Sequence, residues 1–253
     1  MSAQDWMEQQ MDLYLPHVSI DCVVFGFHEN QLRVLLLRFK NTEVWALPGG
    51  RVYREEPVDT AAVRVLEQRT GLSGLYLQQF HSFGDPDRLK SSDFQAILDR
   101  QGVRIGQPSL LFDRTISVGY YALVEFAQVN PAPDLLSDEC RWWDIRDLPK
   151  LFFDHNEIVA VAVRTLRQRL SYEPLGLNLL PEKFTMPELQ RLYETLLGQP
   201  LDRRNFQKRM LAYDFLQRLD ERRTGGAYKA PYLYRFDRER YAAVLQGGGL
   251  AFG

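Results

Sequence analysis

The segment that decides the fold reads Gly50-Arg51-Val52-Tyr53-Arg54-Glu55-Glu56 and, seven residues later, Arg64-Val65-Leu66-Glu67-Gln68-Arg69-Thr70-Gly71-Leu72. It follows a short apolar run, Val44–Leu47, that ends in a Pro-Gly-Gly turn. Pro57 is typical of a first helical residue and Gly71 of a helix end, which predicts a helix from Pro57 to Thr70. A strand, a glycine turn and a capped helix in this order indicate a mixed α/β domain.

Further strands are expected on both sides of this segment. Two runs rich in β-branched and aromatic residues, Val18–Phe27 and Leu32–Phe39, predict a hairpin, because only four polar residues separate them. Ser117–Phe126 and Cys140–Ile145 predict two more strands. Residues 84–110 have the composition of an irregular insertion, with one helical turn expected around Phe94–Leu98.

A long helical pattern, Asn156–Leu170, follows Phe153-Asp154-His155. Glu157 is placed for a capping box with Asp154 at the helix start. Asp154 and His155 would be effector contacts or a hydrolytic pair in a functional interpretation. A capping role for Asp154 and a buried, hydrogen-bonded His155 explain the same two residues more simply.

The deciding segment resembles the Nudix signature, G-x5-E-x7-R-E-U-x-E-E-x-G-U, where U is aliphatic. The positions that match in register are Gly50, Glu56, Arg64, Leu66, Gly71 and Leu72. The resemblance implies a Nudix α/β/α sandwich. It also implies that Glu56 and Arg64 brace the loop against the helix.

The metal-binding positions of that signature are not kept. The family binds a divalent cation with the glutamates of the R-E and E-E steps, which here are Val65, Gln68 and Arg69. These residues share one helix face at about 100° per residue, and none offers a hard carboxylate oxygen. Glu67 lies on the other side of the helix. We therefore expect no metal and no cofactor, and no hydrolase activity from this box.

A small molecule could still bind the former metal cleft, because arginines bind phosphate by charge-assisted hydrogen bonds. The expected effector contacts are Gly49, Gly50, Arg51, Arg54, Glu56 and Arg69. A metal-dependent hydrolase of ADP-ribose-like nucleoside diphosphates remains the alternative. It would need ligands from elsewhere, with candidates at Glu55, Asp85, Asp87, Asp113 and Glu125.

The C-terminal part has the layout of a helix-turn-helix. Thr185 and Glu188 predict a capping box for a helix over Met186–Leu197, and Asp202 predicts the cap of a second helix that runs to about Leu219. Phe206, Met210 and Leu211 supply the core side of the second helix. Its start carries side chains that can bind base edges and phosphates: Arg203, Arg204, Asn205, Gln207 and Lys208.

A basic stretch follows the second helix. Arg222, Arg223, Lys229 and Arg235 occur there without any acid between them, around Gly225-Gly226. This pattern predicts a wing hairpin whose returning strand is Tyr232–Phe236 and whose cations Arg222, Arg223 and Lys229 bind phosphates. A helical appendage for dimerisation or domain packing is the alternative.

Taken together, these features resemble the Nudix-related transcriptional regulators from about Val18 to Tyr241. The resemblance rests on the altered Nudix box, Phe153-Asp154-His155, residues 179–185 and residues 201–206. It implies a Nudix domain followed by a mainly helical winged helix-turn-helix, and a homodimer on a palindromic operator in double-stranded DNA. It also implies a small-molecule effector such as ADP-ribose or a sugar.

Composition fits this interpretation and excludes others. The chain of 253 residues has a net charge of −2, and its acid excess lies in residues 1–171 while residues 172–253 are basic. We expect a Nudix-like effector domain over 1–171 and a DNA-binding domain over 172–253. No apolar run is long enough for a membrane span, and two distant cysteines, Cys22 and Cys140, favour the cytoplasm. The sign of regulation stays open, with a repressor favoured over an activator.

Overall fold

The computed structural model describes residues 12–75, 77–88, 91–100, 102, 113–128, 131–133, 136–170, 177–223 and 230–246. The chain forms two compact units. The first contains the chain up to Phe25, Arg33–Leu123 and Ala127–Val163, and the second contains Gly26–Leu32, Val124–Phe126 and the chain from Arg164 onward. The boundary expected between residues 171 and 172 stays a prediction, because residues 171–176 lie outside the described residues.

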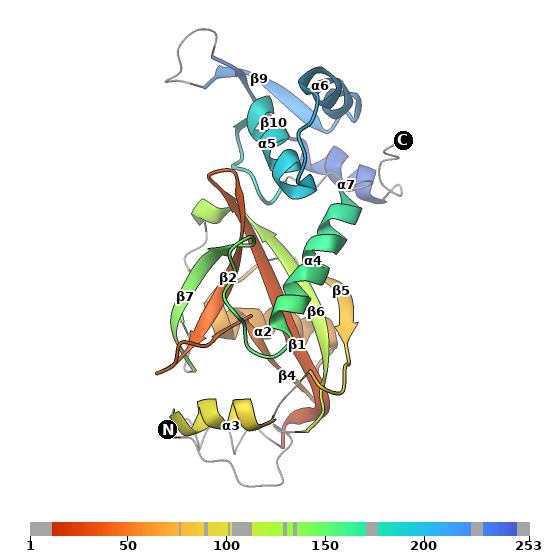
Figure 1. Cartoon of the computed structure of the whole chain (residues 1–253). Helices are drawn as coiled ribbons and strands as arrows, with labels where there is room; N and C mark the ends of the chain where they lie inside the picture. The colour runs from red at the N-terminus through yellow and green to blue at the C-terminus, as the bar shows by residue number, and fades with distance from the viewer. Residues whose placement is uncertain are drawn as a thin grey trace. The chain divides into compact units, whose positions relative to one another are not determined.

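A seven-stranded sheet forms the centre of the first unit (Figure 1). Its strands are β1 (Tyr14–His28), β2 (Gln31–Phe39), β3 (Trp45–Ala46), β4 (Gly49–Tyr53), β5 (Leu77–Phe83), β6 (Ile116–Val124) and β7 (Ser137–Asp144). The main order is β3-β2-β1-β6-β5, with β4 paired to β1 and β7 paired to β2. The predicted hairpin is confirmed, and its turn places Glu29 and Asn30 at φ 49° and 60°, the left-handed region that tight hairpin turns require.

Helices cover this sheet on both faces, α2 (Val58–Thr70) behind it and the start of α4 (His155–Arg169) in front (Figure 1). Pro57 is the residue before α2 and not its first residue, because its ψ of 147° is extended. Gly71 ends α2 in the left-handed region, as predicted. The expected short turn is a longer helix, α3 (Ser91–Arg100), whose Ile97 and Phe94 pack with Ala46 and Phe152. A short 3₁₀ helix, η1 (Phe126–Gln128), follows β6.

Among its described residues, the second unit contains a three-stranded sheet in the order β8-β10-β9, the end of α4 and the helices that follow it. These elements are β8 (Phe184–Thr185), α5 (Met186–Leu197), α6 (Arg203–Ala212), β9 (Leu216–Arg222), β10 (Tyr232–Phe236) and α7 (Arg238–Gln246). The predicted wing strand Tyr232–Phe236 is confirmed. It pairs with β9 in antiparallel register, as a hairpin strand must. Sequence reasoning missed α7.

Two details of the second predicted helix are wrong. It ends at Ala212 and not near Leu219, because Asp214 adopts φ 54° and turns the chain into β9. The fully buried Phe215 then packs against Phe236 and Tyr241, which requires a strand and not a further helical turn. Leu211 is 44% exposed and does not belong to the core side of α6, whereas Phe206 and Met210 do.

The caps of the two helices are confirmed. The Thr185 hydroxyl accepts from the Glu188 N–H, and the Glu188 side chain accepts from the Thr185 N–H at 2.7 Å. The Asp202 carboxylate accepts from the Asn205 N–H at 2.8 Å. No helix among the described residues has both the length and the apolar character needed to cross a bilayer.

Candidate functional site

Glu56 and Arg64 brace the loop after β4 against α2, as the signature implied. Arg64 Nε donates to Glu56 Oε2 at 3.0 Å, and a second Arg64 nitrogen donates to the Arg51 carbonyl at 2.8 Å. The Tyr53 N–H donates to Glu56 Oε1 at 2.7 Å. The hydrogen bonds from Arg64 lower the pKa of Glu56, although burial opposes this shift. Glu56 is therefore an ionised structural brace.

Aromatic rings complete this brace. The Arg64 guanidinium lies 4.0 Å from the centroid of the Tyr53 ring, and Tyr14 stacks on Tyr53 with centroids 5.3 Å apart. Such stacking adds attraction between the cation and the ring face. Burial is the main reason that the pKa of Tyr14 rises to about 12. The loop after β4 is thus fixed against both α2 and the start of β1.

The three positions where the family carries metal ligands have other uses in this structure. Val65 is buried, and a Cβ built on Gly50 would lie 2.9 Å from Val65 Cγ2. Gln68 accepts a hydrogen bond from Arg64 at 2.9 Å. Arg69 is a buried cation on α2. An isopropyl group, an amide and a guanidinium do not provide the hard oxygens that Mg²⁺ requires, so these residues do not fit a divalent cation.

The carboxylates considered as replacement ligands do not come together either. Within the part of the chain that the structure describes, no three Asp, Glu, His or Cys side chains gather in a way that could hold a metal ion.

The predicted effector residues have different surroundings. Arg51 donates to the Thr115 hydroxyl at 3.0 Å, and burial lowers its pKa. Arg54 is exposed and donates to the Asp12 carbonyl at 3.0 Å. Arg64 binds the carboxylate of Glu56 and the backbone carbonyl of Arg51, while the Arg51 side chain binds Thr115. Arg69 lies on the buried side of α2, so it is less accessible than the other two arginines.

Gly49 and Gly50 are explained by packing. A Cβ on Gly49 would lie 2.5 Å from Asp21 Oδ1 and 3.0 Å from the Ile20 carbonyl oxygen. A Cβ on Gly50 would likewise be too close to the Val65 side chain. Both glycines let β4 approach β1 and α2 closely, whether or not they also contact an effector.

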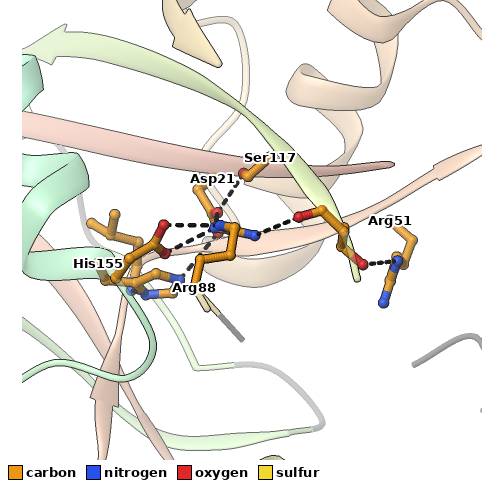
Figure 2. Close-up of polar contacts among 8 residues, drawn as sticks. Asp21, Arg51, Arg88, Ser117 and His155 are labelled. Carbon is orange, nitrogen blue, oxygen red and sulfur yellow. Dashed lines mark hydrogen bonds and ion pairs between the residues drawn. The ribbon is translucent and has the colours of Figure 1, made fainter. Parts of the chain in front are cut away.

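Sequence reasoning singled out Asp154 and His155 but missed Asp21, Arg88 and Ser117, which form a buried polar cluster with His155 (Figure 2). The half-buried Asp154 joins this cluster through Arg88. Arg88 donates to both oxygens of Asp154, at 2.8 and 2.9 Å, and to Asp21 at 3.3 Å. The Ser117 hydroxyl donates to the same Asp21 oxygen at 2.5 Å. Arg88 also reaches the Thr115 carbonyl at 3.4 Å, and Thr115 binds Arg51. The cluster thereby continues to the predicted effector residue Arg51.

His155 is buried and hydrogen-bonded, as the simpler interpretation held. The Leu47 N–H donates to His155 Nδ1 at 2.9 Å, so that nitrogen must be unprotonated. The proton is then on Nε2, which lies 3.4 Å from Asp21 Oδ1. Ser117 binds Asp21 and not His155, so these side chains do not have the order of a hydrolytic triad.

The charge of Asp21 depends on this cluster. Burial by itself raises the pKa of Asp21, but His155, Arg88 and Ser117 together outweigh burial and lower it to about 2. Asp154 takes part through its bond to Arg88, while its backbone carbonyl accepts from the first turn of α4. The sequence signals were Asp21 inside an otherwise apolar run and the Phe153-Asp154-His155 motif. Nothing marked Arg88.

The predicted DNA-binding residues of α6 form an exposed polar surface at its N-terminal end. Arg203, Arg204, Asn205 and Lys208 are exposed and Gln207 is half-buried. The opposite side of α6 is anchored by Phe206, whose ring meets Tyr193 of α5 edge to face at 5.3 Å. This arrangement presents long polar side chains on a capped, anchored helix, the geometry with which a helix enters a major groove.

The two adjacent wing arginines have different partners. Arg222 donates to the Tyr232 hydroxyl at 2.7 Å and to the Ala230 carbonyl at 3.1 Å. Arg223 donates to both oxygens of Glu188 at 2.6 Å. Arg235 of the returning strand donates to Gln217 at 2.8 Å. Lys229 and Gly225-Gly226 lie outside the described residues.

Comparison with known proteins follows the same division of the chain. The family described as NUDIX domain matches residues 15–162, and the family described as NrtR DNA-binding winged helix domain matches residues 176–236. The chain is 29% identical over 240 residues to the ADPR responsive transcriptional repressor NtrR of Acinetobacter baylyi, covering 92% of this chain and 87% of that protein.

Two further relatives complete the comparison. An ADP-ribose pyrophosphatase of Methanocaldococcus jannaschii is 30% identical over 156 residues, covering 60% of this chain and 76% of that protein. The crystal structure of Shewanella oneidensis NrtR complexed with a 27mer DNA superimposes with a TM-score of 0.67 at 26% identity, covering 89% of this chain and 95% of that one.

Proposed function

The chain belongs to the Nudix family and carries a winged helix domain of the NrtR type, and on this premise we propose that it is a transcriptional repressor that binds duplex DNA and responds to ADP-ribose. The single observation that carries DNA binding is the exposed polar end of α6 within the residues that match a DNA-binding winged helix. Arg, Asn and Gln side chains can read base edges in the major groove.

The Nudix domain in this proposal binds its ligand without hydrolysing it. Val65, Gln68 and Arg69 stand where the signature has metal-binding glutamates. The Val65 side chain packs directly against Gly50. ADP-ribose is proposed as the effector because the relative that matches almost the whole chain is an ADPR responsive repressor. Arg51 and Arg54 lie within the altered signature segment, and their guanidinium groups can bind a diphosphate.

A homodimer on a palindromic operator is part of the proposal. Two copies of α6 placed one helical turn of DNA apart would enter successive major grooves. ADP-ribose changes DNA affinity if it binds one arrangement of the dimer better than the other, by that difference in binding free energy. A protein with this role acts in the cytoplasm, where Cys22 and Cys140 remain thiols.

A selection on genomic DNA tests this function. The purified chain is incubated with fragments of its own genome at near-physiological salt, with and without ADP-ribose, and retained fragments are sequenced. We expect a few fragments that share a palindrome, with retention changed by ADP-ribose. The triple variant Arg203→Gln, Arg204→Gln, Asn205→Ala is the control and should retain none.

The hydrolase alternative has a direct readout in the same preparation. ADP-ribose is incubated with the chain and Mg²⁺, and the released AMP is measured. Absence of selective retention together with Mg²⁺-dependent turnover would overturn the repressor and establish the hydrolase.

A further inference from the structure

We propose that Arg218 and Arg222 of the wing hairpin form a phosphate-binding pair held in place by Tyr232, and that the neighbouring Arg223 takes no part in DNA binding. The inference rests on the proposed function, because its ligand is the DNA backbone. It adds Arg218 and Tyr232 to the interface and removes Arg223 from it.

The Tyr232 ring gathers the two arginines. The Arg222 guanidinium carbon lies 4.1 Å from the ring centroid and that of Arg218 lies 4.7 Å away. Tyr232 is opposite Arg222 in the hairpin, and Tyr234 is opposite Arg218. The register is irregular between these pairs, so β9 carries a bulge there. The bulge explains how two arginines four positions apart reach one ring.

Both guanidinium groups remain available to an anion. Arg218 and Arg222 are exposed, and in the described part of the chain neither is in an ion pair with a carboxylate. A guanidinium that stacks on a ring keeps its N–H donors in its own plane, pointing past the ring. Arg222 uses two of its donors on Tyr232 and Ala230, which fixes its orientation.

The acidic residues of β9 do not neutralise the positive charge of Arg218 and Arg222. Glu221 is bound to Lys183, with Nζ 2.8 and 2.7 Å from its two oxygens. Asp220 is the exposed acid that remains on the strand. Arg218 and Arg222 therefore outnumber the one acid of β9 that has no basic partner among the described residues, and this positive charge attracts the polyanionic backbone of DNA.

Arg223 is committed to a structural partner. Its guanidinium binds both oxygens of Glu188, and the same carboxylate accepts from the Thr185 N–H in the capping box of α5. Burial raises the pKa of Glu188, but Arg223 and Thr185 outweigh burial and lower it, so the carboxylate stays charged. The carboxylate of Glu188 neutralises the charge of Arg223, so Arg223 attracts a phosphate less than Arg218 and Arg222 do.

Pre-organisation explains why phosphate binding favours the pair on Tyr232. A long arginine side chain loses rotamer freedom when it binds, and that cost weakens binding. Tyr232 has already restricted Arg218 and Arg222 in the unbound protein. Bidentate binding of phosphate by such a fixed guanidinium is among the stronger polar interactions.

Salt dependence of DNA binding tests the proposal. The full chain is titrated onto a duplex of a retained palindrome, and the association constant is measured by fluorescence anisotropy from low to physiological salt. Each phosphate contact contributes about 0.9 to the slope of log K against log salt. Arg218→Gln and Arg222→Gln should each lower that slope by about one unit.

Arg223→Gln is the matched control, since it removes the same charge one residue away. It should leave the slope unchanged even if it lowers the melting temperature. Tyr232→Phe keeps the ring but removes the hydroxyl that accepts from Arg222, so it should weaken binding less than Tyr232→Leu. Tyr232→Leu should weaken binding severalfold with both arginines still present. Melting temperatures confirm that each variant is folded.

The outcomes separate the two hypotheses. If the wild-type chain binds the duplex and the Arg218 and Arg222 variants keep its slope, the phosphate pair is wrong while the repressor stands. A loss of slope in Arg223→Gln equal to that in Arg222→Gln would also overturn the inference. No binding of any duplex by the wild-type chain would overturn the proposed function itself.

Discussion

Gly49 lies against Asp21 so closely that a Cβ on Gly49 would be 2.5 Å from the carboxylate oxygen Oδ1. The two residues are opposite each other in the β1–β4 pair. Asp21 is held in turn by Arg88, Ser117 and His155. Gly49, the first glycine of the Pro-Gly-Gly turn, therefore leaves the space that the buried Asp21 carboxylate occupies next to β4.

Gly49→Ala should destabilise the first unit. The added methyl group must displace Asp21 or the Ile20 carbonyl, and overpacking of this kind costs about 1–3 kcal/mol. Urea unfolding followed by circular dichroism measures the change. In an Asp21→Ala background the same substitution should cost less, because its main clash is gone. Equal costs in both backgrounds would show that Asp21 is not the limiting contact.

Arg88→Ala should be among the most damaging single substitutions outside the apolar core. It leaves the buried Asp21 and the half-buried Asp154 without their cation, and breaking a buried ion pair in this way costs about 3–5 kcal/mol. Arg146→Ala is the matched control, since it removes an arginine bound to Asp144 at the exposed surface. Comparable urea midpoints for the two variants would contradict the role given to Arg88.

Acid should weaken the first unit through Asp21. Its pKa is lowered from an ordinary 3.8 to about 2 in the folded protein, so its contribution is complete above the ordinary value. That contribution, on the order of 2 kcal/mol, is lost as the pH falls from about 4 to about 2. Ser117→Ala removes one bond to the carboxylate and should flatten the pH dependence of the urea midpoint. An unchanged profile would contradict this assignment.

Thr185→Ala should destabilise the winged helix. It removes the hydroxyl that accepts from the Glu188 N–H at the start of α5, and loss of such a cap costs about 1 kcal/mol. Thr185→Ser keeps the hydroxyl and is the control. Thermal melting should rank the wild type and the serine variant above the alanine variant, and any other order would argue against the cap.

Magnesium should not stabilise the chain. The positions of the signature glutamates hold Val65, Gln68 and Arg69, so we expect the same melting temperature in millimolar Mg²⁺ and in EDTA. ADP-ribose should raise the melting temperature equally in both, because a ligand that binds only the folded state stabilises it by mass action. A rise that depends on Mg²⁺ would point back to a hydrolase.

Local features of the fold could be predicted from the sequence because their signals lie within a few residues. The end of α2 at Gly71, the capping box of Thr185 and Glu188, and the Asp202 cap each depend on contacts three or four positions apart. The end of α6 could not be predicted in this way, because it depends on contacts between residues far apart in the sequence. These contacts join the buried Phe215 to Phe236 and Tyr241.

The sequence by itself determined the Nudix scaffold and the capped helices of the winged helix, since these depend on residue type at fixed short spacing. It also placed Val65, Gln68 and Arg69 at the signature's glutamate positions. Only the tertiary structure brought Asp21, Arg88 and Asp154 together across 66 and 67 positions of the chain. It alone gave different partners to Arg222 and Arg223, which are adjacent and chemically identical. The physical reason is that a charged side chain takes its role from the partner that folding places beside it: Tyr232 for Arg222, and Glu188 for Arg223.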